Sequence, residues 1–482
     1  MRRLLFITLC STLLCPVLAV AAQDATGEAS ESGEGTEASP LEAEAEPEPE
    51  AAIYDLAALT YAARENYPRL RAARHKVVAA EAQLDEALVS PFFQFYGTAA
   101  ITVAPEARGT PIFSPDSQLP LSNPWRPVVV VGASGVLPIY TFGKIDALHD
   151  AARAGVRAAS RERQVALDRV EFDVRRAYYG LQLSLDLQQM LDEGAAKMRE
   201  AEEQLIEMLE SGDDGVSDQD RYRLSTARAT MIARHSQAHR LEQTTRHALT
   251  TLTGVEEFEV PECPLSPLEF EARPLRFYQA AAEGSRPELE MLQAGIDARE
   301  ANVDATRARY YPDLAITAAA SYSYGPGISD QSNPFIIDQA NFASLGAGLV
   351  ARWSFDVWGN YHRVRRAEAE LAELNALTEE AQRGVGLEVA NAWEGLADAR
   401  RREQAWAEGH RQARRWFISA GSAYSVGTAE PRDLIDAAGA YFQARTEHVS
   451  SINDVNAAIA DLQRSTGTQL LPAGGWEVRC EY

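Results

Sequence analysis

The sequence predicts a mainly α-helical protein that carries a smaller set of β-strands and is built as two copies of one unit. Long stretches place apolar residues at three- and four-residue spacing, which is typical of helices packed along one seam. Four shorter segments instead alternate apolar and polar residues, which is the period of a strand. These features recur in the same order in both halves of the 482 residues. Such self-similarity at a nearly constant offset indicates an internal duplication.

The N-terminal segment at residues 1–22 has the composition of a secretory signal peptide. Arg2 and Arg3 precede an apolar run, and small residues follow up to Ala21. The alternative is an N-terminal membrane helix, although the run is short of the ~20 residues that span a membrane. Lipid attachment at Cys15 is not expected, because Leu13 and Leu14 before it are too large for the usual lipidation signal. Residues 23–52 contain ten acidic residues and no Lys or Arg. Because such a segment buries too little apolar surface to order itself, we expect an acidic disordered linker.

The first copy of the unit is expected at residues 53–260. Its first strand places Phe95 and Ile101 on an apolar face, with polar residues on the other face. No proline occurs between Ile139 and Val260, so long helices follow the strands. The expected elements are strands at about 92–103 and 128–140, and helices at about 144–210 and 219–252. The first of these helices would be roughly 100 Å long at 1.5 Å per residue.

The second copy is expected at residues 274–471, after a linker at 261–273 and before a C-terminal tail at 472–482. Its signals match those of the first copy in order: Tyr310-Tyr-Pro312 corresponds to Val89-Ser-Pro91 before a strand. The expected elements are strands at about 313–324 and 343–356, and helices at about 360–424 and 432–466.

The four strands cannot form a membrane barrel alone, since a barrel needs about eight strands and open edges are not tolerated in lipid. Their length of about ten residues suits tilted membrane strands. Aromatic residues near the strand ends suit the girdles of such barrels: Phe93, Phe95, Tyr322, Tyr324 and Trp353. We therefore expect several chains to share one transmembrane β-barrel. On a polar strand face, Arg352 would line the lumen, or else be an edge-strand charge; a soluble sandwich is the alternative for the strands as a whole.

The turn between the two long helices of the second copy lies in Tyr424–Asp436. Gly427 is suited to end one helix and Pro431 to begin the next. Asp433 and Asp436 follow three apart, so they share one face of the new helix. The alternative is that these two carboxylates simply complement the positive end of the helix dipole.

The first copy has a matching turn, in which Gly212 and Asp218 have the spacing of Gly427 and Asp433. Because both turns follow equivalent long helices, we expect them at the same end of the molecule, far from all four strands.

Cysteine, histidine and charge define what else the chain can do. Cys263 and Cys480 each lie just beyond one copy, and export permits a disulfide between them, with two unpaired thiols as the alternative. His235 and His239 are four apart, but no third ligand is evident and a solvated helix face is the simpler interpretation. We expect no metal site, no cofactor and no catalytic motif, since phosphate-binding glycine loops, nucleophile elbows and zinc spacings are missing from the sequence. The net charge of −24 argues against a nucleic-acid partner.

Taken together, these residues resemble the TolC family of outer-membrane efflux channels over about Ile53–Leu471. The closest local match is Tyr424–Asp436, and the strand exits Leu137–Gly143 and Trp353–Gly359 add to it. The resemblance implies a homotrimer in outer-membrane lipid, with a 12-stranded barrel of four strands per subunit and an α-helical tube crossing the periplasm. It also implies docking of a periplasmic adaptor and an inner-membrane transporter. The implied function is a passive exit duct for efflux or type I secretion, and not an enzyme.

The resemblance also assigns roles to residues of the turns. Asp433 and Asp436 match an acidic constriction at the pore entrance, whereas Tyr424, Ser217 and Asp218 match a hydrogen-bond network that keeps the entrance closed. Ala429 stands where the family has an arginine, so the charge pairing of the entrance is expected to differ here. The exported substrate is left open among drugs, metal ions and proteins. The alternative function is a periplasmic structural or adaptor-like coiled-coil protein without a pore.

Overall fold

The computed structural model describes residues 52–89, 92, 94–106, 124–211, 217–261, 263–327, 338, 340–426, 428–470, 472, 475 and 476. All of these belong to the unit that begins at Ala51, and the description below concerns that unit alone. The predicted signal peptide and nearly all of the predicted acidic linker lie outside the described residues.

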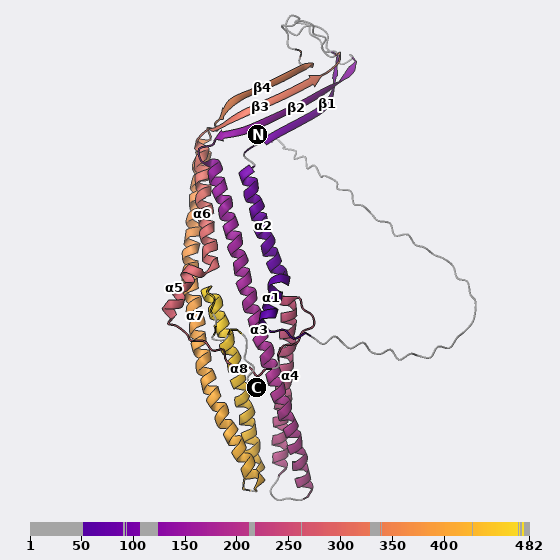
Figure 1. The fold of residues 1–482 in the computed structure, drawn as a ribbon, viewed down its shortest axis with the longest axis vertical. Helices are drawn as coiled ribbons and strands as arrows, with labels where there is room; N and C mark the ends of the chain where they lie inside the picture. The colour runs from indigo at the N-terminus through magenta and orange to yellow at the C-terminus, as the bar shows by residue number, and fades with distance from the viewer. Residues whose placement is uncertain are drawn as a thin grey trace, which may run out of the picture. The chain divides into compact units, whose positions relative to one another are not determined.

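Helices of very different length make up most of this unit (Figure 1). They are α1 (Leu56–Asn66), α2 (Pro68–Val89), α3 (Lys144–Glu210), α4 (Asp218–Thr253), α5 (Leu275–Ser285), α6 (Pro287–Arg307), α7 (Val357–Ser425) and α8 (Pro431–Thr466), with a 3-10 turn at Ala308–Tyr310. The two longest, α3 and α7, contain 67 and 69 residues. Each therefore runs roughly 100 Å at 1.5 Å per residue, as the sequence predicts. α4 packs beside α3 and α8 beside α7, while α2 and α6 flank α3 nearer the strands.

Glycine ends the two returning helices at equivalent places in the two copies. Gly254 after α4 and Gly467 after α8 have φ of 72° and 67°, a left-handed conformation that a β-carbon disfavours. The N–H of each glycine donates to the carbonyl of the residue four positions earlier. At the start of α7, the Asp356 side chain accepts from the Gly359 N–H at 3.0 Å, a typical N-cap contact.

The strands form one antiparallel sheet in the order β1-β2-β3-β4. Their bounds are β1 (Gln94–Pro105), β2 (Trp125–Tyr140), β3 (Asp313–Tyr324) and β4 (Phe342–Arg352). β1 and β4 are the edges, and each pairs with one neighbour only within this sheet. Among the described residues, no helix is long and apolar enough to cross a membrane.

The two faces of the sheet differ in chemistry, as the alternating pattern predicts. One face exposes large apolar side chains, which in register are those of Phe95, Ile101, Val129, Val131, Leu137, Ile316, Leu345 and Leu349. Ile101 is 78% exposed and Leu345 is 86% exposed, which is unfavourable in water. The opposite face carries small and polar residues, and there the hydroxyls of Ser321 and Ser344 lie 2.7 Å apart.

The last strand is shorter than the predicted segment at 343–356. β4 ends at Arg352, because its partner β3 begins at Asp313, which is paired with Arg352 in register. The alternation continues through Trp353 and Phe355, but these residues have no strand to pair with, and α7 begins at Val357. The prediction of a strand up to residue 356 was therefore wrong at its C-terminal end.

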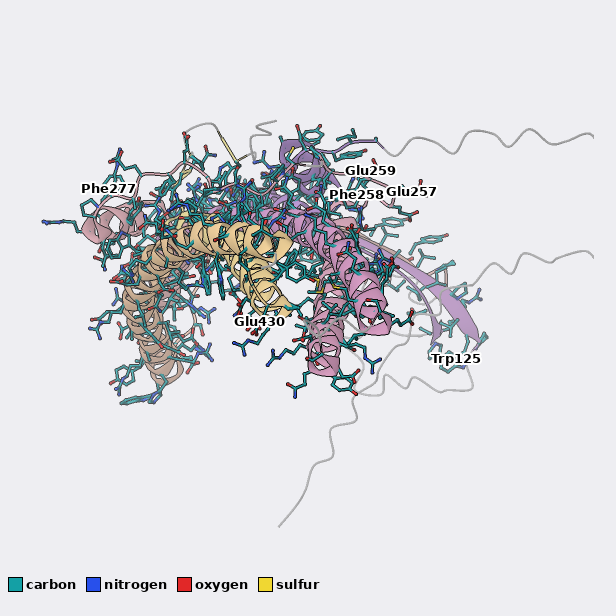
Figure 2. All side chains as sticks on the ribbon, turned by 90° about the horizontal axis from the view of Figure 1, so that it is seen from below. Trp125, Glu257, Phe258, Glu259, Phe277 and Glu430 are labelled. Atoms are coloured by element: carbon teal, nitrogen blue, oxygen red, sulfur yellow. The ribbon has the colours of Figure 1, made fainter. Side chains whose placement is uncertain are left out.

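The main hydrophobic core lies midway along the helices, where α1, α3, α4, α7 and α8 meet. Tyr179, Leu181 and Ile459 are fully buried there. In a view along the helices, these elements lie on an arc, with Phe258 and Phe277 on its convex side (Figure 2). We call this level of the molecule the waist.

The segment between the two copies crosses the waist and is fixed to three long helices; we call residues 263–274 the waist segment. Asn456 of α8 holds it twice, since its Oδ1 accepts from the Leu268 N–H at 2.9 Å and its Nδ2 donates to the Ser266 carbonyl at 3.0 Å. Asp186 of α3 accepts from the Leu265 N–H at 3.4 Å. From α7, side-chain N–H groups of Trp393 and Arg400 donate to carbonyls of the segment.

Equivalent junctions cap the C-terminal ends of α4 and α8. In the first copy, Asn66 Nδ2 donates to the Thr253 carbonyl at 2.8 Å. In the second, the buried guanidinium of Arg286 donates to the Ser465 carbonyl at 2.6 Å. These contacts satisfy carbonyls that the helices themselves leave without a partner. One junction joins α1 and α2 to the end of α4, and the other joins α5 and α6 to the end of α8.

Candidate functional site

The helix ends that flank the turns of both hairpins lie at the end of the unit that is remote from the sheet (Figure 1). The sequence predicts this placement from the duplication. The glycines expected at the turns, Gly212 and Gly427, lie outside the described residues. The helix ends that flank them are described, and they bring the turn regions of the two hairpins together.

A small apolar cluster holds the two hairpins against each other near these turns. It consists of Met198 and Leu205 of α3 with Leu224 and Met231 of α4, and Ile435 and Phe442 of α8 pack against it. A β-carbon on Gly194 would come within 2.8 Å of Met231 and Phe442. A larger residue would therefore displace these two side chains at the crossing.

Ser217 and Asp218 lie at the start of α4, and their described contacts are with neighbouring residues of the same helix. The Ser217 hydroxyl and backbone N–H both donate to Asp220 Oδ2, at 2.7 Å and 3.1 Å, and the bond from the backbone N–H is the Asp220 half of a capping box. Asp218 is exposed and lies 3.5 Å from Arg221. These contacts fix the first turn of α4.

Tyr424, near the end of α7, contacts the other hairpin through a sulfur atom. Its hydroxyl lies 3.6 Å from Met208 Sδ of α3. Within one subunit, the structure gives no contact of Tyr424 with Ser217 or Asp218, the other members of the expected network. The described link between the hairpins at this level is thus apolar with one weak hydrogen bond.

Asp433 and Asp436 are exposed on the first two turns of α8. Ile435 between them packs against the first hairpin, so the two carboxylates lie away from that contact. Arg432 lies 3.9 Å from Asp433, and both side chains are half exposed. A pair of this kind contributes about 0–1 kcal/mol, which leaves the carboxylates available to other partners.

The remaining sequence-derived candidates do not join this site. His235 lies 3.2 Å from Asp192 and His239 lies 3.6 Å from Glu242, and the described residues hold no group of three or more side chains that suits a metal ion. Cys263 is disulfide-bonded. Its expected partner, Cys480, lies outside the described residues.

A polar seam that the sequence analysis missed joins α7 and α8 between the waist and the turns. The His410 ring of α7 lies 5.5 Å from the His448 ring and 5.6 Å from the Tyr441 ring of α8, measured between centroids. His448 Nε2 is 3.5 Å from Glu403. The His410 Nε2 atom is buried, and no described residue offers it a hydrogen bond.

Positive charge surrounds His410 on both helices. Burial is the largest cause that lowers the pKa of His410, followed by His448, Arg445 of α8, and Arg414 and Arg411 of α7. The nearby acidic groups engage other partners, since Glu403 is beside His448 and Glu193 of α3 is 3.6 Å from Arg445. His410 is therefore held neutral in this packing.

We expect acid to loosen this seam. A histidine with a lowered pKa in the packed state takes a proton more readily when the helices separate, so stability falls as pH drops below about 6.5, the ordinary pKa of histidine. The melting temperature of the helical signal should therefore fall more for the wild type than for His410→Phe when pH is lowered from about 7.5 to about 5.5. His75→Phe, at an exposed position of α2, should behave like the wild type. Equal pH dependence in wild type and His410→Phe would contradict the prediction.

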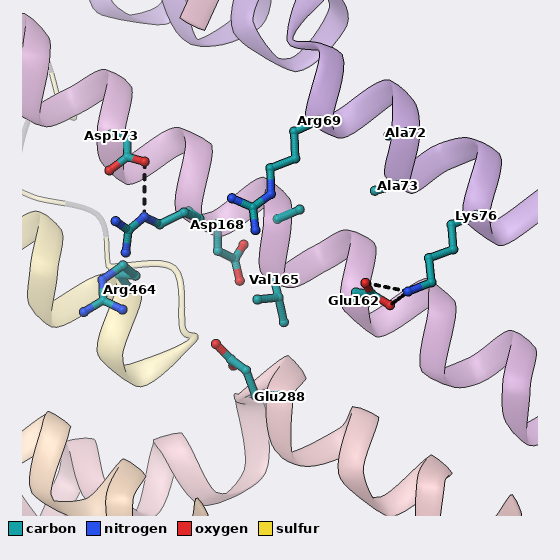
Figure 3. A pocket seen from close by; sticks show the side chains of 12 residues that line it. Arg69, Ala72, Ala73, Lys76, Glu162, Val165, Asp168, Asp173, Glu288 and Arg464 are labelled. Atoms are coloured by element: carbon teal, nitrogen blue, oxygen red, sulfur yellow. Dashed lines mark hydrogen bonds and ion pairs between the residues drawn. The ribbon is translucent and has the colours of Figure 1, made fainter. Parts of the chain in front are cut away.

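A solvent-filled cavity of about 620 Å³ lies at the waist between α2, α3, α6 and the end of α8 (Figure 3). Asp168 points into it towards Glu288, and burial raises the pKa of Asp168. Four basic residues line the cavity together with four acidic ones, namely Arg69, Lys76, Arg169 and Arg464 with Glu162, Asp168, Asp173 and Glu288. Because these charges balance, the cavity favours ions of neither sign.

A sheet with an exposed apolar face, continued by long helical hairpins, defines a membrane-anchored subunit with an extended helical body. A family model described as outer membrane efflux protein matches residues 59–255 and 279–468, and the chain belongs to this family. It is thus an outer-membrane protein of the efflux family, with its helical part in the periplasm.

Similarity to individual proteins supports the same fold. Protein CyaE of Bordetella pertussis is 26% identical over 194 residues, which covers 39% of this chain and 38% of CyaE. The crystal structure of CusC, described as forming a transmembrane channel, matches with a TM-score of 0.71 and 16% identity over 87% of this chain and 93% of CusC. The CmeC outer membrane channel of Campylobacter jejuni matches with a TM-score of 0.68 and 16% identity over 89% of this chain and 90% of CmeC.

Proposed function

We propose that three copies of this chain form a passive exit duct of a three-part export complex. In this arrangement each subunit contributes four strands to one 12-stranded barrel and its hairpins to a helical tube in the periplasm. A periplasmic adaptor and an inner-membrane transporter dock at the hairpin turns and open the duct, for efflux or for type I secretion.

The unpaired edges of the sheet support the shared barrel. β1 and β4 are both edges of a sheet whose apolar side chains are exposed. Strand edges in lipid must be paired, because each unsatisfied backbone group there costs several kcal/mol. Pairing β4 of one copy with β1 of the next satisfies both edges and places the apolar face towards lipid.

The observation that carries the proposed entrance is the exposure of Asp433 and Asp436 at the end remote from the sheet. In a trimer around one axis, these residues supply six carboxylates at the narrow end of the tube. Rings of acidic side chains favour cations in pores. We therefore propose that this ring is the periplasmic gate, and that the adaptor and transporter open it by separating the hairpins.

Single-channel recording tests this proposal. We expect purified protein in planar bilayers to give a small conductance with cation selectivity, and Asp433→Asn with Asp436→Asn to lower that selectivity several-fold, because the six charges are removed. Divalent cations added on the turn side should block the wild type more than the variant.

Glu380→Gln serves as the matched control, since Glu380 is an exposed carboxylate of α7 far from the turn, and it should leave selectivity unchanged. Conductance that is indifferent to the aspartate substitutions would place the constriction elsewhere in the duct. Failure to insert and conduct at all would favour a periplasmic coiled-coil protein without a pore.

A further inference from the structure

Ionisable side chains are almost absent from the strands. In the four strand sequences only Arg126, Asp313 and Arg352 are charged, and all three lie at or next to strand ends. Arg126, at the end remote from the helices, lies 3.8 Å from Glu106. The other two mark the level at which the sheet meets the helical body.

Among the described residues at this junction, one cation has no ion-pair partner. Asp313 and Arg352 are opposite each other in register, so they are suited to pair. Instead, Asp313 forms an ion pair with Lys144, the first residue of α3, and the Lys144 Nζ atom lies 2.5 Å from the carboxylate. Arg352 is exposed, and the described residues place no carboxylate in ion-pair contact with it.

The face on which Arg352 lies is the polar one. In register it shares this face with Thr317, Ser321 and Ser344, whereas most of the large exposed apolar side chains of the sheet occupy the opposite face. A cavity of about 300 Å³ lies between the polar face and the first turns of α3, and Lys144, Asp313 and Arg352 all line it. Because the apolar face must turn to lipid, the polar face with this cavity turns to water.

The charged residues that line this cavity therefore sum to +1 per subunit, from Lys144 (+1), Arg352 (+1) and Asp313 (−1). This charge lies at the opposite end of the helical body from the carboxylates Asp433 and Asp436.

We propose that Arg352 is a selectivity-determining residue of the duct, as the unpaired cation of a basic collar where the barrel joins the helical tube. This inference rests on the proposed three-chain barrel, in which three copies place a charge of +3 around the lumen. Basic rings attract anions in pores. The collar thus favours small anions and anionic solutes at the exit, and it opposes the cation preference that the acidic entrance produces.

The reversal potential across a salt gradient measures this effect. It is recorded on purified protein in planar bilayers with KCl near 0.1 M, where the Debye length is about 10 Å and the collar is incompletely screened. Arg352→Gln is expected to shift the reversal potential towards stronger cation selectivity, because the junction becomes neutral. Asp313→Asn is expected to shift it in the opposite direction, because the junction gains charge. Both shifts should shrink near 1 M KCl, where the Debye length is about 3 Å.

Arg366→Gln is the control, since its side chain is 79% exposed on α7 outside the sheet and it removes the same charge from the same subunit. It should leave the reversal potential unchanged, and Arg352→Lys should retain the wild-type value. Wild-type reversal potentials in both Arg352→Gln and Asp313→Asn would overturn the collar, while a response to the Asp433 and Asp436 substitutions in the same bilayers would leave the proposed gate standing. A wild-type protein that forms no channel would refute the duct itself, and the collar with it.

Discussion

Replacing Arg286 by methionine is expected to lower the free energy of unfolding by about 3 kcal/mol, the low end of the cost of breaking a buried ion pair from one side, because the partner carboxylates Glu288 and Glu388 are about a third exposed. The guanidinium is 5% exposed, lies 2.9 Å from Glu388 of α7, and donates to the Ser465 carbonyl at the end of α8. It also lies 3.1 Å from Glu288. Methionine has a similar volume but leaves these carboxylates and the carbonyl without their shared donor.

The loss is measured by guanidinium unfolding of the detergent-solubilised protein at fixed concentration, followed by far-UV circular dichroism. Arg299→Met, on the helix α6 that Arg286 precedes, is the matched control, because Arg299 is half exposed and its ion pair among the described residues is with Glu370, at 2.6 Å. The free energy of unfolding of this control variant should fall by no more than about 1 kcal/mol. Similar losses in the two variants would contradict the role assigned to Arg286.

Replacing Asn456 by leucine is expected to detach the waist segment from α8. The change leaves the Leu268 N–H and the Ser266 carbonyl without their partners, and each buried orphan costs about 1–3 kcal/mol. Leucine also fits poorly at a site that is fully buried and polar. We expect a lower free energy of unfolding together with faster hydrogen exchange at the Leu268 amide.

Asn453→Leu is the control, since Asn453 lies on α8 only three residues earlier and is partly exposed. In this control variant, the amide hydrogens of the waist segment should exchange at the wild-type rate. If both variants exchanged alike, the segment would be held by its contacts with α3 and α7 rather than by Asn456.

The helices and strands were predictable because their periods are strong and the duplication shows each twice. The end of the last strand was not predictable. The alternation of apolar and polar residues continues through Trp353 and Phe355, past Arg352, which is the last residue that β3 pairs with. Periodicity reports which side chains share a face, whereas strand bounds depend on pairing with a distant segment.

Part of the polar seam between α7 and α8 could also have been predicted from the sequence. Leu396, Glu403, His410, Phe417 and Tyr424 recur every seven residues along α7, as do Leu434, Tyr441, His448, Val455 and Leu462 along α8. A heptad that places Glu and His in seam positions signals a specific polar contact. The contacts of Asn456 and Arg286 gave no such signal, because their partners are backbone atoms and side chains brought together only by the tertiary fold.

Among the turn residues, the sequence predicts that Asp433 and Asp436 share one face of the helix, and both are exposed in the structure. The partner of Tyr424 within the subunit, Met208, could not be inferred. Its neighbour depends on how two hairpins, distant in sequence, are set side by side. The roles of these residues in a gate remain predictions that the recordings above test.

The unbroken length of α7 makes it a lever. From Leu396 in the waist core to its last residue, Ser425, the helix rises about 44 Å at 1.5 Å per residue. A rigid tilt of only about 5° at the waist then displaces its free end by about 4 Å over that length, roughly the width of a carboxylate. The helix would tilt about the waist, where the waist segment binds three helices. A partner that binds at the turn end therefore needs to tilt the helix by only a few degrees to change the width of the opening there.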